Sequence, residues 1–171
     1  DGRSFLPVLQ GKRNSHKQHV FGLMTTRGIL NGSDHYGIRS VRSDRYKLIV
    51  NLTPEVPFRN IFMKSSIFRS WEAKARSGDK DAREKVRRFR QRPAEELYDI
   101  TADPYEWQNL AGDPKLAEVK SRLKAQLDRW MKAQGDRGQQ TELEALKHQA
   151  RRRNNKKNKK NKKNKKKPGT T

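Results

Sequence analysis

The chain has 171 residues, a formal net charge of +22 and only 31% apolar residues. This length allows one domain, and the composition is far from that of an average globular protein. The absence of cysteine excludes disulfides, thiolate metal sites and thiol nucleophiles, and no run of about 18 apolar residues exists that could span a membrane. Because the sequence begins at Asp1 without a signal-like segment, we interpret this start as a truncation.

The first third of the chain predicts a short helix, a strand and a hairpin. Residues 1–12 carry apolar side chains around a proline, which suits a helical turn docked on a larger body. The apolar run 19–24 predicts a strand that ends in a polar loop at 25–34. Two segments rich in β-branched and aromatic residues, 36–41 and 46–52, are joined by four polar residues, so they predict an antiparallel hairpin.

The middle of the chain predicts helices and one more strand. The composition turns helical over residues 60–92, and the charged second half of this stretch has few apolar residues and is expected on the surface. Residues 95–100 predict a strand. Directly after it, Asp103, Pro104 and Glu106 have the pattern of a capping box, which predicts a short helix.

The clearest predicted element is an amphipathic helix over residues 113–134. Asp113 is a good N-cap, Pro114 is a good first residue, and apolar residues recur every three or four positions until Gly135 ends the run. Residues 140–149 predict a weaker helix. The fold class is therefore α+β, a small antiparallel sheet packed by a long C-terminal amphipathic helix. So small a sheet buries little surface and is expected to need a larger body to pack on.

The chain ends in a basic tail. Residues 151–167 hold twelve of the 41 basic residues and no acidic residue, so residues 1–150 keep 29 basic and 19 acidic residues. With no apolar residue to bury, the tail is expected to be disordered. It is either a solubilising segment without a specific partner or an arm for nucleic acid, a membrane surface or another polyanion. We divide the chain into a subdomain at 1–134 and a weakly helical to disordered Lys/Asn-rich tail at 135–171.

Common catalytic motifs are absent from the sequence. It contains no nucleophile elbow, no phosphate-binding glycine loop and no dinucleotide fingerprint. His16 and His19 lack the Cys, Asp or Glu neighbours that a structural zinc site requires, so a solvated pair is the favoured interpretation. The residues alone therefore predict no metal site.

The loop after the first predicted strand is the best candidate binding site. Thr25, Thr26 and Arg27 precede a glycine, and this grouping suits the binding of sulfate, phosphate or carboxylate by charge-assisted hydrogen bonds. His35 and Arg39 follow within the length of one strand. An exposed loop without a ligand explains the same residues equally well. Arg39 lies inside the hairpin, where pairing with a carboxylate and binding of substrate are both open.

Several segments resemble, in consistent order, the C-terminal region of type I sulfatases, and in most detail the heparan N-sulfatases. The segments are HVFGLMTTRG, YGIRSVRSDRYKLIVNL and ELYDITADPYEWQNLAGDP, followed by the amphipathic helix. The resemblance covers residues 1–134, and the pattern ELYD…DP-x-E-x-x-NLA is its most specific part. It implies an enzyme of the alkaline-phosphatase-like fold, in which a large N-terminal domain holds the active site and a smaller sheet-and-helix subdomain closes one side of the substrate pocket.

The resemblance also implies cofactors and a location. In this family a Cys or Ser in a C/S-x-P-x-R motif becomes formylglycine, whose hydrate attacks sulfur, and calcium neutralises the sulfate oxygens. None of the seven prolines here has Cys or Ser two positions before it, so we expect this chain to supply no catalytic residue and no metal ligand, and to be inactive alone. The missing catalytic domain is its expected partner. Family members are secreted, periplasmic or lysosomal.

The expected function is that of a C-terminal fragment of a sulfatase acting on sulfate ester or sulfamate groups of a heparan-type saccharide. By the resemblance, Thr25, Thr26, Arg27 and His35 contact the substrate, with Arg27 as the main anionic contact. The loop differs from that of mammalian heparan N-sulfatases, which leaves the sulfated substrate open. Two alternatives remain, a polyanion-binding module acting through the basic tail and a structural remnant separated from its catalytic half.

Overall fold

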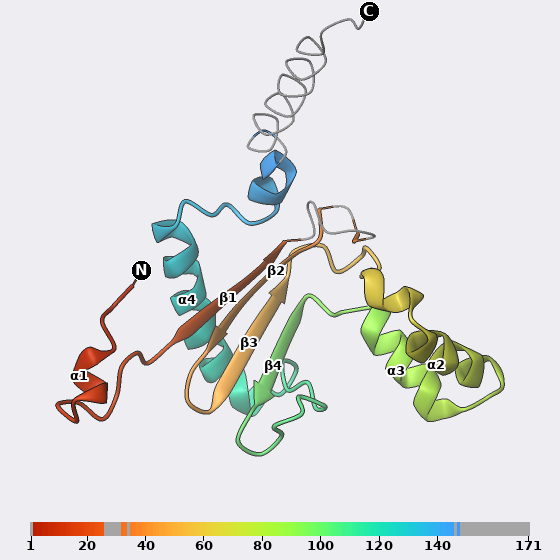
Figure 1. The fold of residues 1–171 in the computed structure, drawn as a ribbon, viewed down its shortest axis with the longest axis horizontal. Coiled ribbons are helices and arrows are strands. Elements are labelled where there is room, and N and C mark those ends of the chain that lie inside the picture. Colours follow the sequence, from red (N-terminus) through yellow and green to blue (C-terminus); the bar gives the residue numbers. More distant parts are fainter. Residues whose placement is uncertain (1, 26–31, 34, 146, 148–171) are drawn as a thin grey trace, which may run out of the picture.

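The computed structural model shows an antiparallel sheet with its long helix on one face (Figure 1). The described residues are 2–25, 32, 33, 35–145 and 147. In chain order the elements are α1 (Leu6–Leu9), β1 (Val20–Thr25), β2 (Gly37–Arg42), β3 (Tyr46–Asn51), the 3-10 helix η1 (Ile61–Lys64), α2 (Ser66–Arg76), α3 (Lys80–Arg90), β4 (Glu95–Asp99), the 3-10 helix η2 (Pro114–Leu116) and α4 (Ala117–Ala133). The predicted α+β class is confirmed. No helix within these residues has the length and apolar character needed to cross a membrane.

The four strands pair in sequence order, β1-β2-β3-β4, and each neighbouring pair is antiparallel. The predicted hairpin is the pair β2 and β3. Alternate residues of a strand point to opposite faces. The register therefore places Phe21, Val41, Leu48 and Leu97 in one row across all four strands, on the same face of the sheet.

Helix α4 lies across this apolar row, behind the sheet in Figure 1. Leu123 and Leu127 of α4 are buried against the row, and Trp130 stacks on Phe21 with ring centroids 5.1 Å apart. The predicted packing of one amphipathic helix on a sheet is confirmed. The predicted cap residue, Asp113, accepts the Lys115 N–H at 2.9 Å, but it caps the 3-10 helix η2 that leads into α4, and α4 itself has no side-chain cap.

Helices α2 and α3 form an antiparallel pair beside the β4 side of the sheet (Figure 1). Each begins at a side-chain cap: Ser65 accepts the Phe68 N–H at 3.1 Å, and Asp79 accepts the Ala82 N–H at 2.9 Å. Phe68 also packs on Phe89 with ring centroids 5.1 Å apart. The helical interpretation of this stretch is confirmed.

The short helix predicted after β4 is wrong, because this segment forms turns. Glu106 has a φ of 56° and directs its carboxylate to Lys47 of β3, at 2.9 Å, instead of back to the backbone at Asp103. The Leu110 N–H donates to the Leu97 carbonyl at 2.8 Å, which holds the segment along the edge of β4. A tertiary ion pair and an edge hydrogen bond thus replace the local capping pattern.

The C-terminal part is described only as far as residue 147. Residues 139–145 are helical, which agrees with the weaker helix predicted over residues 140–149 as far as the structure describes them. The basic tail, for which disorder is predicted, lies outside the described residues.

Candidate functional site

The candidate site lies at the end of the sheet where β1 ends and β2 begins. Thr25 is the last residue of β1, and its hydroxyl donates to the Glu142 carboxylate at 2.5 Å. The His35 Nδ1 lies 3.4 Å from the Glu142 carbonyl oxygen. Two of the predicted site residues therefore meet at Glu142, while Thr26 and Arg27 lie outside the described residues.

Arg39 of β2 lies beneath this corner and is only 1% exposed. Its Nε donates to Asp136 at 2.5 Å, and its Nη2 donates to Glu142 at 2.8 Å. Its Nη1 donates to the carbonyl oxygens of Met24 and Ile38 at 3.3 and 3.1 Å. Of the two roles left open for Arg39, the structure shows pairing with carboxylates, since two of them neutralise its charge.

We define the cluster as Thr25, His35, Arg39, Asp136 and Glu142, and its ion pairs shift the pKa values of Arg39 and Asp136. Burial opposes the charged form of Arg39, but the hydrogen bonds that Arg39 donates to Asp136 and Glu142 outweigh this effect and raise the arginine pKa. Burial likewise acts to raise the pKa of Asp136, and the hydrogen bonds from Arg39 and from the Gly138 N–H outweigh it, so that this pKa is lowered.

The lowered pKa of Asp136 predicts a loss of stability in acid. The contribution of this carboxylate is fully present above the ordinary carboxyl pKa of 3.8 and is lost as the pH falls through the lower folded-state pKa. We expect Asp136→Asn to be less stable than the parent chain near neutral pH, with the difference shrinking below pH 3.8. Urea unfolding at several pH values measures this.

Asp128→Asn, at an exposed carboxylate of α4, is the matched control, with an expected change within about 0.5 kcal/mol throughout. A difference between Asp136→Asn and the parent that stays constant as the pH is lowered would contradict the assignment.

The cluster does not fit the calcium site of a sulfatase. In proteins, calcium is bound by roughly six to eight oxygen ligands, many of which are carboxylate oxygens. The two carboxylates here, Asp136 and Glu142, are already bound to Arg39. Within the described part of the chain, no group of three or more His, Cys, Asp or Glu residues is placed to hold a metal ion. His16 and His19 instead lie beside aromatic rings.

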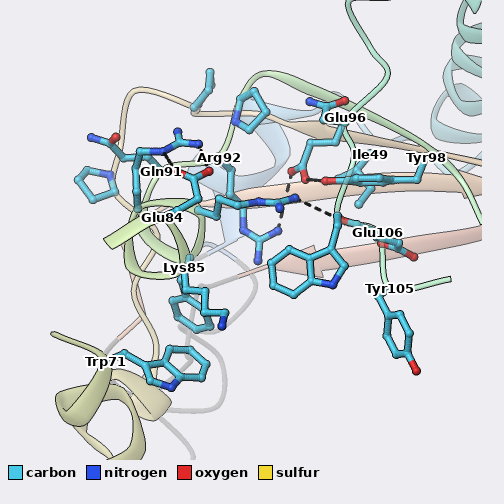
Figure 2. A pocket seen from close by; sticks show the side chains of 18 of the residues that line it. Ile49, Trp71, Glu84, Lys85, Gln91, Arg92, Glu96, Tyr98, Tyr105 and Glu106 are labelled. Atoms are coloured by element: carbon cyan, nitrogen blue, oxygen red, sulfur yellow. Dashed lines mark hydrogen bonds and ion pairs between the residues drawn. The ribbon is translucent and has the colours of Figure 1, made fainter. Parts of the chain in front are cut away.

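A groove of about 1110 Å³ lies on the sheet face that α4 leaves uncovered. Ile49, Glu96 and Tyr98 line it from the sheet, and Figure 2 shows Lys85 and Tyr105 on opposite sides of it. The other lining residues come from α2 and α3, from the segments that follow β3 and α3, and from the turns that follow β4. The sequence interpretation did not predict this groove, because its parts are distant in sequence and join only through the fold.

An antiparallel meander covered by a long C-terminal helix defines an α+β subdomain, and comparison with known proteins identifies its class. No protein-family model matches the chain. The chain is 39% identical over 139 residues to an ulvan-active sulfatase of Formosa agariphila, a match covering 80% of this chain and 25% of that protein. It is 33% identical over 132 residues to human N-sulphoglucosamine sulphohydrolase, covering 75% of this chain and 25% of that protein.

A solved structure of a 2-O GAG sulfatase aligns with a TM-score of 0.48 and 22% identity, over 79% of this chain and 20% of that one. By the sequence identities with the two curated relatives, the chain is a type I sulfatase C-terminal region, which confirms the family that the sequence motifs predicted. The chain spans about a quarter of the length of these relatives.

Proposed function

We propose that this chain is part of an enzyme that hydrolyses sulfate ester or sulfamate groups of a sulfated saccharide. The observation that carries the proposal is the identity of 39% and 33% with an ulvan-active sulfatase and with N-sulphoglucosamine sulphohydrolase over most of the chain. The two names share a sulfated saccharide as the class of substrate. A heparan-type substrate is the finer proposal, and the motifs shared with heparan N-sulfatases support it.

The proposed role of the chain is to shape the substrate pocket, whereas a further domain supplies the reactive centre. The sequence contains no C/S-x-P-x-R motif, and the carboxylates of the cluster are paired with Arg39. Formylglycine and calcium would therefore belong to that domain. Phe5, Leu6 and Leu9 are 49 to 73% exposed, which supports the presence of a larger neighbouring body. The family suggests a secreted, periplasmic or lysosomal enzyme.

Within this role, we propose that Thr25, Thr26, Arg27 and His35 face the substrate. The structure supports this by holding both ends of the segment, Thr25 and His35, at one corner of the sheet. The charge of Arg39 is neutralised there by two carboxylates. Arg27 is therefore the proposed cationic contact for a sulfate group of the saccharide.

The test is the activity of the chain joined to an upstream domain that carries the C/S-x-P-x-R motif. A hydrogen bond to a charged group contributes about 1.5–3 kcal/mol, so we expect Arg27→Ala to lower kcat/KM on a sulfated oligosaccharide roughly tenfold or more. Sulfate release measures this value. Arg42→Ala, at the opposite, exposed end of β2, is the matched control and should leave kcat/KM unchanged.

Unchanged turnover by Arg27→Ala would remove this segment from the substrate site. Absence of any sulfate release by the joined parent enzyme would contradict the proposed function itself.

A second candidate function, polyanion binding through the basic tail, is favoured by the twelve basic residues at 151–167. The tail has no aromatic residue, so base stacking is not available and binding would be nonspecific. It should weaken steeply with salt and disappear when these basic residues are replaced by glutamine.

A further inference from the structure

The positive charge outside the tail is concentrated in the α2–α3 region. Residues 59–92 hold 12 basic and 4 acidic residues, whereas all of residues 1–150 hold 29 basic and 19 acidic residues. The region thus carries +8 of a net +10. Neither α2 nor α3 contributes to the cluster around Arg39, so this charge has no role in the site described above.

One side of α3 brings part of this charge to the groove on the uncovered face of the sheet. Lys85 and Arg88 line the groove from α3, and Arg92 follows from the segment after the helix. Figure 2 shows Lys85 and Arg92 on the α3 side of the groove. Arg88 donates to the Glu106 carbonyl oxygen at 3.3 Å, contacts the Tyr98 hydroxyl and lies 5.0 Å over the ring of Trp107. All three of these partners are neutral groups.

Four carboxylates line the same groove, and all but Glu55 are engaged by other residues. Glu96 accepts hydrogen bonds from Asn51 at 2.7 Å and from the Tyr98 hydroxyl at 2.6 Å, and it pairs with Arg92 of the same groove at 3.8 Å. Glu106 pairs with Lys47 at 2.9 Å. Glu84 of α3 forms an ion pair with Arg87 at 2.6 Å. Arg88 lies near enough to Glu84 to help lower the pKa of that carboxyl, but no salt bridge joins the two, so the guanidinium of Arg88 remains available to an anionic ligand.

Two exposed aromatic rings line the same groove, and one of them, Trp107, lies beside Arg88. Tyr105 is 81% exposed and Trp107 is 53% exposed, although large aromatic side chains gain most from burial. A sugar ring presents an apolar C–H face that packs on such rings, while a sulfate group accepts two parallel hydrogen bonds from a guanidinium. Rings and guanidinium groups side by side therefore match a saccharide that carries sulfate groups.

We infer that this groove is an accessory binding site for a sulfated polysaccharide chain, on the opposite face of the sheet from Thr25 and His35. The inference rests on the proposed function for its class of ligand. Arg88 binds a sulfate group, and Trp107 packs against the adjoining sugar ring. The site would hold a polymeric substrate at a distance from the sulfate that is hydrolysed.

The experiment measures binding of dextran sulfate, with unsulfated dextran of equal length for comparison. The protein is the full chain in which the twelve basic residues of 151–167 are replaced by glutamine, so that the tail does not dominate. We expect Arg88→Gln and Trp107→Ala each to weaken binding of dextran sulfate at least tenfold, measured by calorimetry. Arg83→Gln, an equal loss of charge at an exposed position of α3 outside the groove, should change it less than twofold.

Arg88→Lys keeps the charge but removes the guanidinium, and an intermediate loss supports recognition of a sulfate group. Circular dichroism establishes that each variant is folded. An equal effect of Arg83→Gln and Arg88→Gln would overturn the inference, as would equal binding of unsulfated dextran. A single-stranded oligonucleotide that binds as tightly as dextran sulfate through Arg88 and Trp107 would also overturn it, in favour of nucleic acid.

Sulfate release from a short sulfated oligosaccharide by the joined enzyme tests the proposed function separately from the accessory site. If this activity is present and the groove variants bind dextran sulfate normally, only the accessory site is contradicted. If no sulfate is released, the proposed function fails whatever the groove binds.

Discussion

Replacement of Arg39 by methionine is expected to lower the free energy of unfolding of the chain by about 3–5 kcal/mol. The side chains of Asp136 and Glu142 are only 5% and 3% exposed, and both depend on the Arg39 guanidinium for neutralisation. Methionine fills a similar volume but leaves two carboxylates buried without a counter-charge. Urea unfolding followed by circular dichroism near neutral pH measures the change.

Arg42→Met is the matched control, because Arg42 lies on the same strand with an exposed side chain, and we expect a change within about 0.5 kcal/mol. A triple variant, Arg39→Met with Asp136→Leu and Glu142→Leu, should recover much of the lost stability, since apolar replacement of a complete buried ion cluster is often neutral. A loss below about 1 kcal/mol for Arg39→Met alone would show that the cluster contributes little.

The second large effect is expected for Leu127→Ala in α4, with a loss of about 2–5 kcal/mol. Leu127 is fully buried, and it belongs to the core cluster that joins α4 to Val41, Leu48 and Leu97 of the sheet. Truncation to alanine removes apolar contacts and leaves a cavity between helix and sheet. The same denaturation experiment measures the loss. Leu9→Ala, at a side chain that is 73% exposed, is the control and should be nearly neutral.

The elements that the sequence predicted correctly are those determined by local pattern. Alternating apolar residues predicted the β2–β3 hairpin, and the regular apolar spacing after Asp113 predicted α4. The capping-box prediction failed because it considered only neighbours in sequence. The carboxylate of Glu106 is bound by Lys47, which lies 59 residues away in the chain.

The candidate site could be predicted only in part. Thr25 could be predicted as a site residue from its position at the end of the first strand. In the structure, Thr25 and His35 both contact Glu142. The carboxylate partners of Arg39 could not be predicted, since Asp136 and Glu142 lie 97 and 103 residues further along the chain. Acidic residues in a weakly helical segment carry no local signal of such pairing.

The return of the chain onto the sheet after α4 also determines how far the protein can be trimmed. A version ending at Gln134 would keep all the strands and the long helix, yet it would lose both counter-ions of Arg39. The boundary suggested by the sulfatase motifs is therefore a poor stop site for recombinant production. A shortened protein for crystallisation should extend at least through the helical turn that carries Glu142.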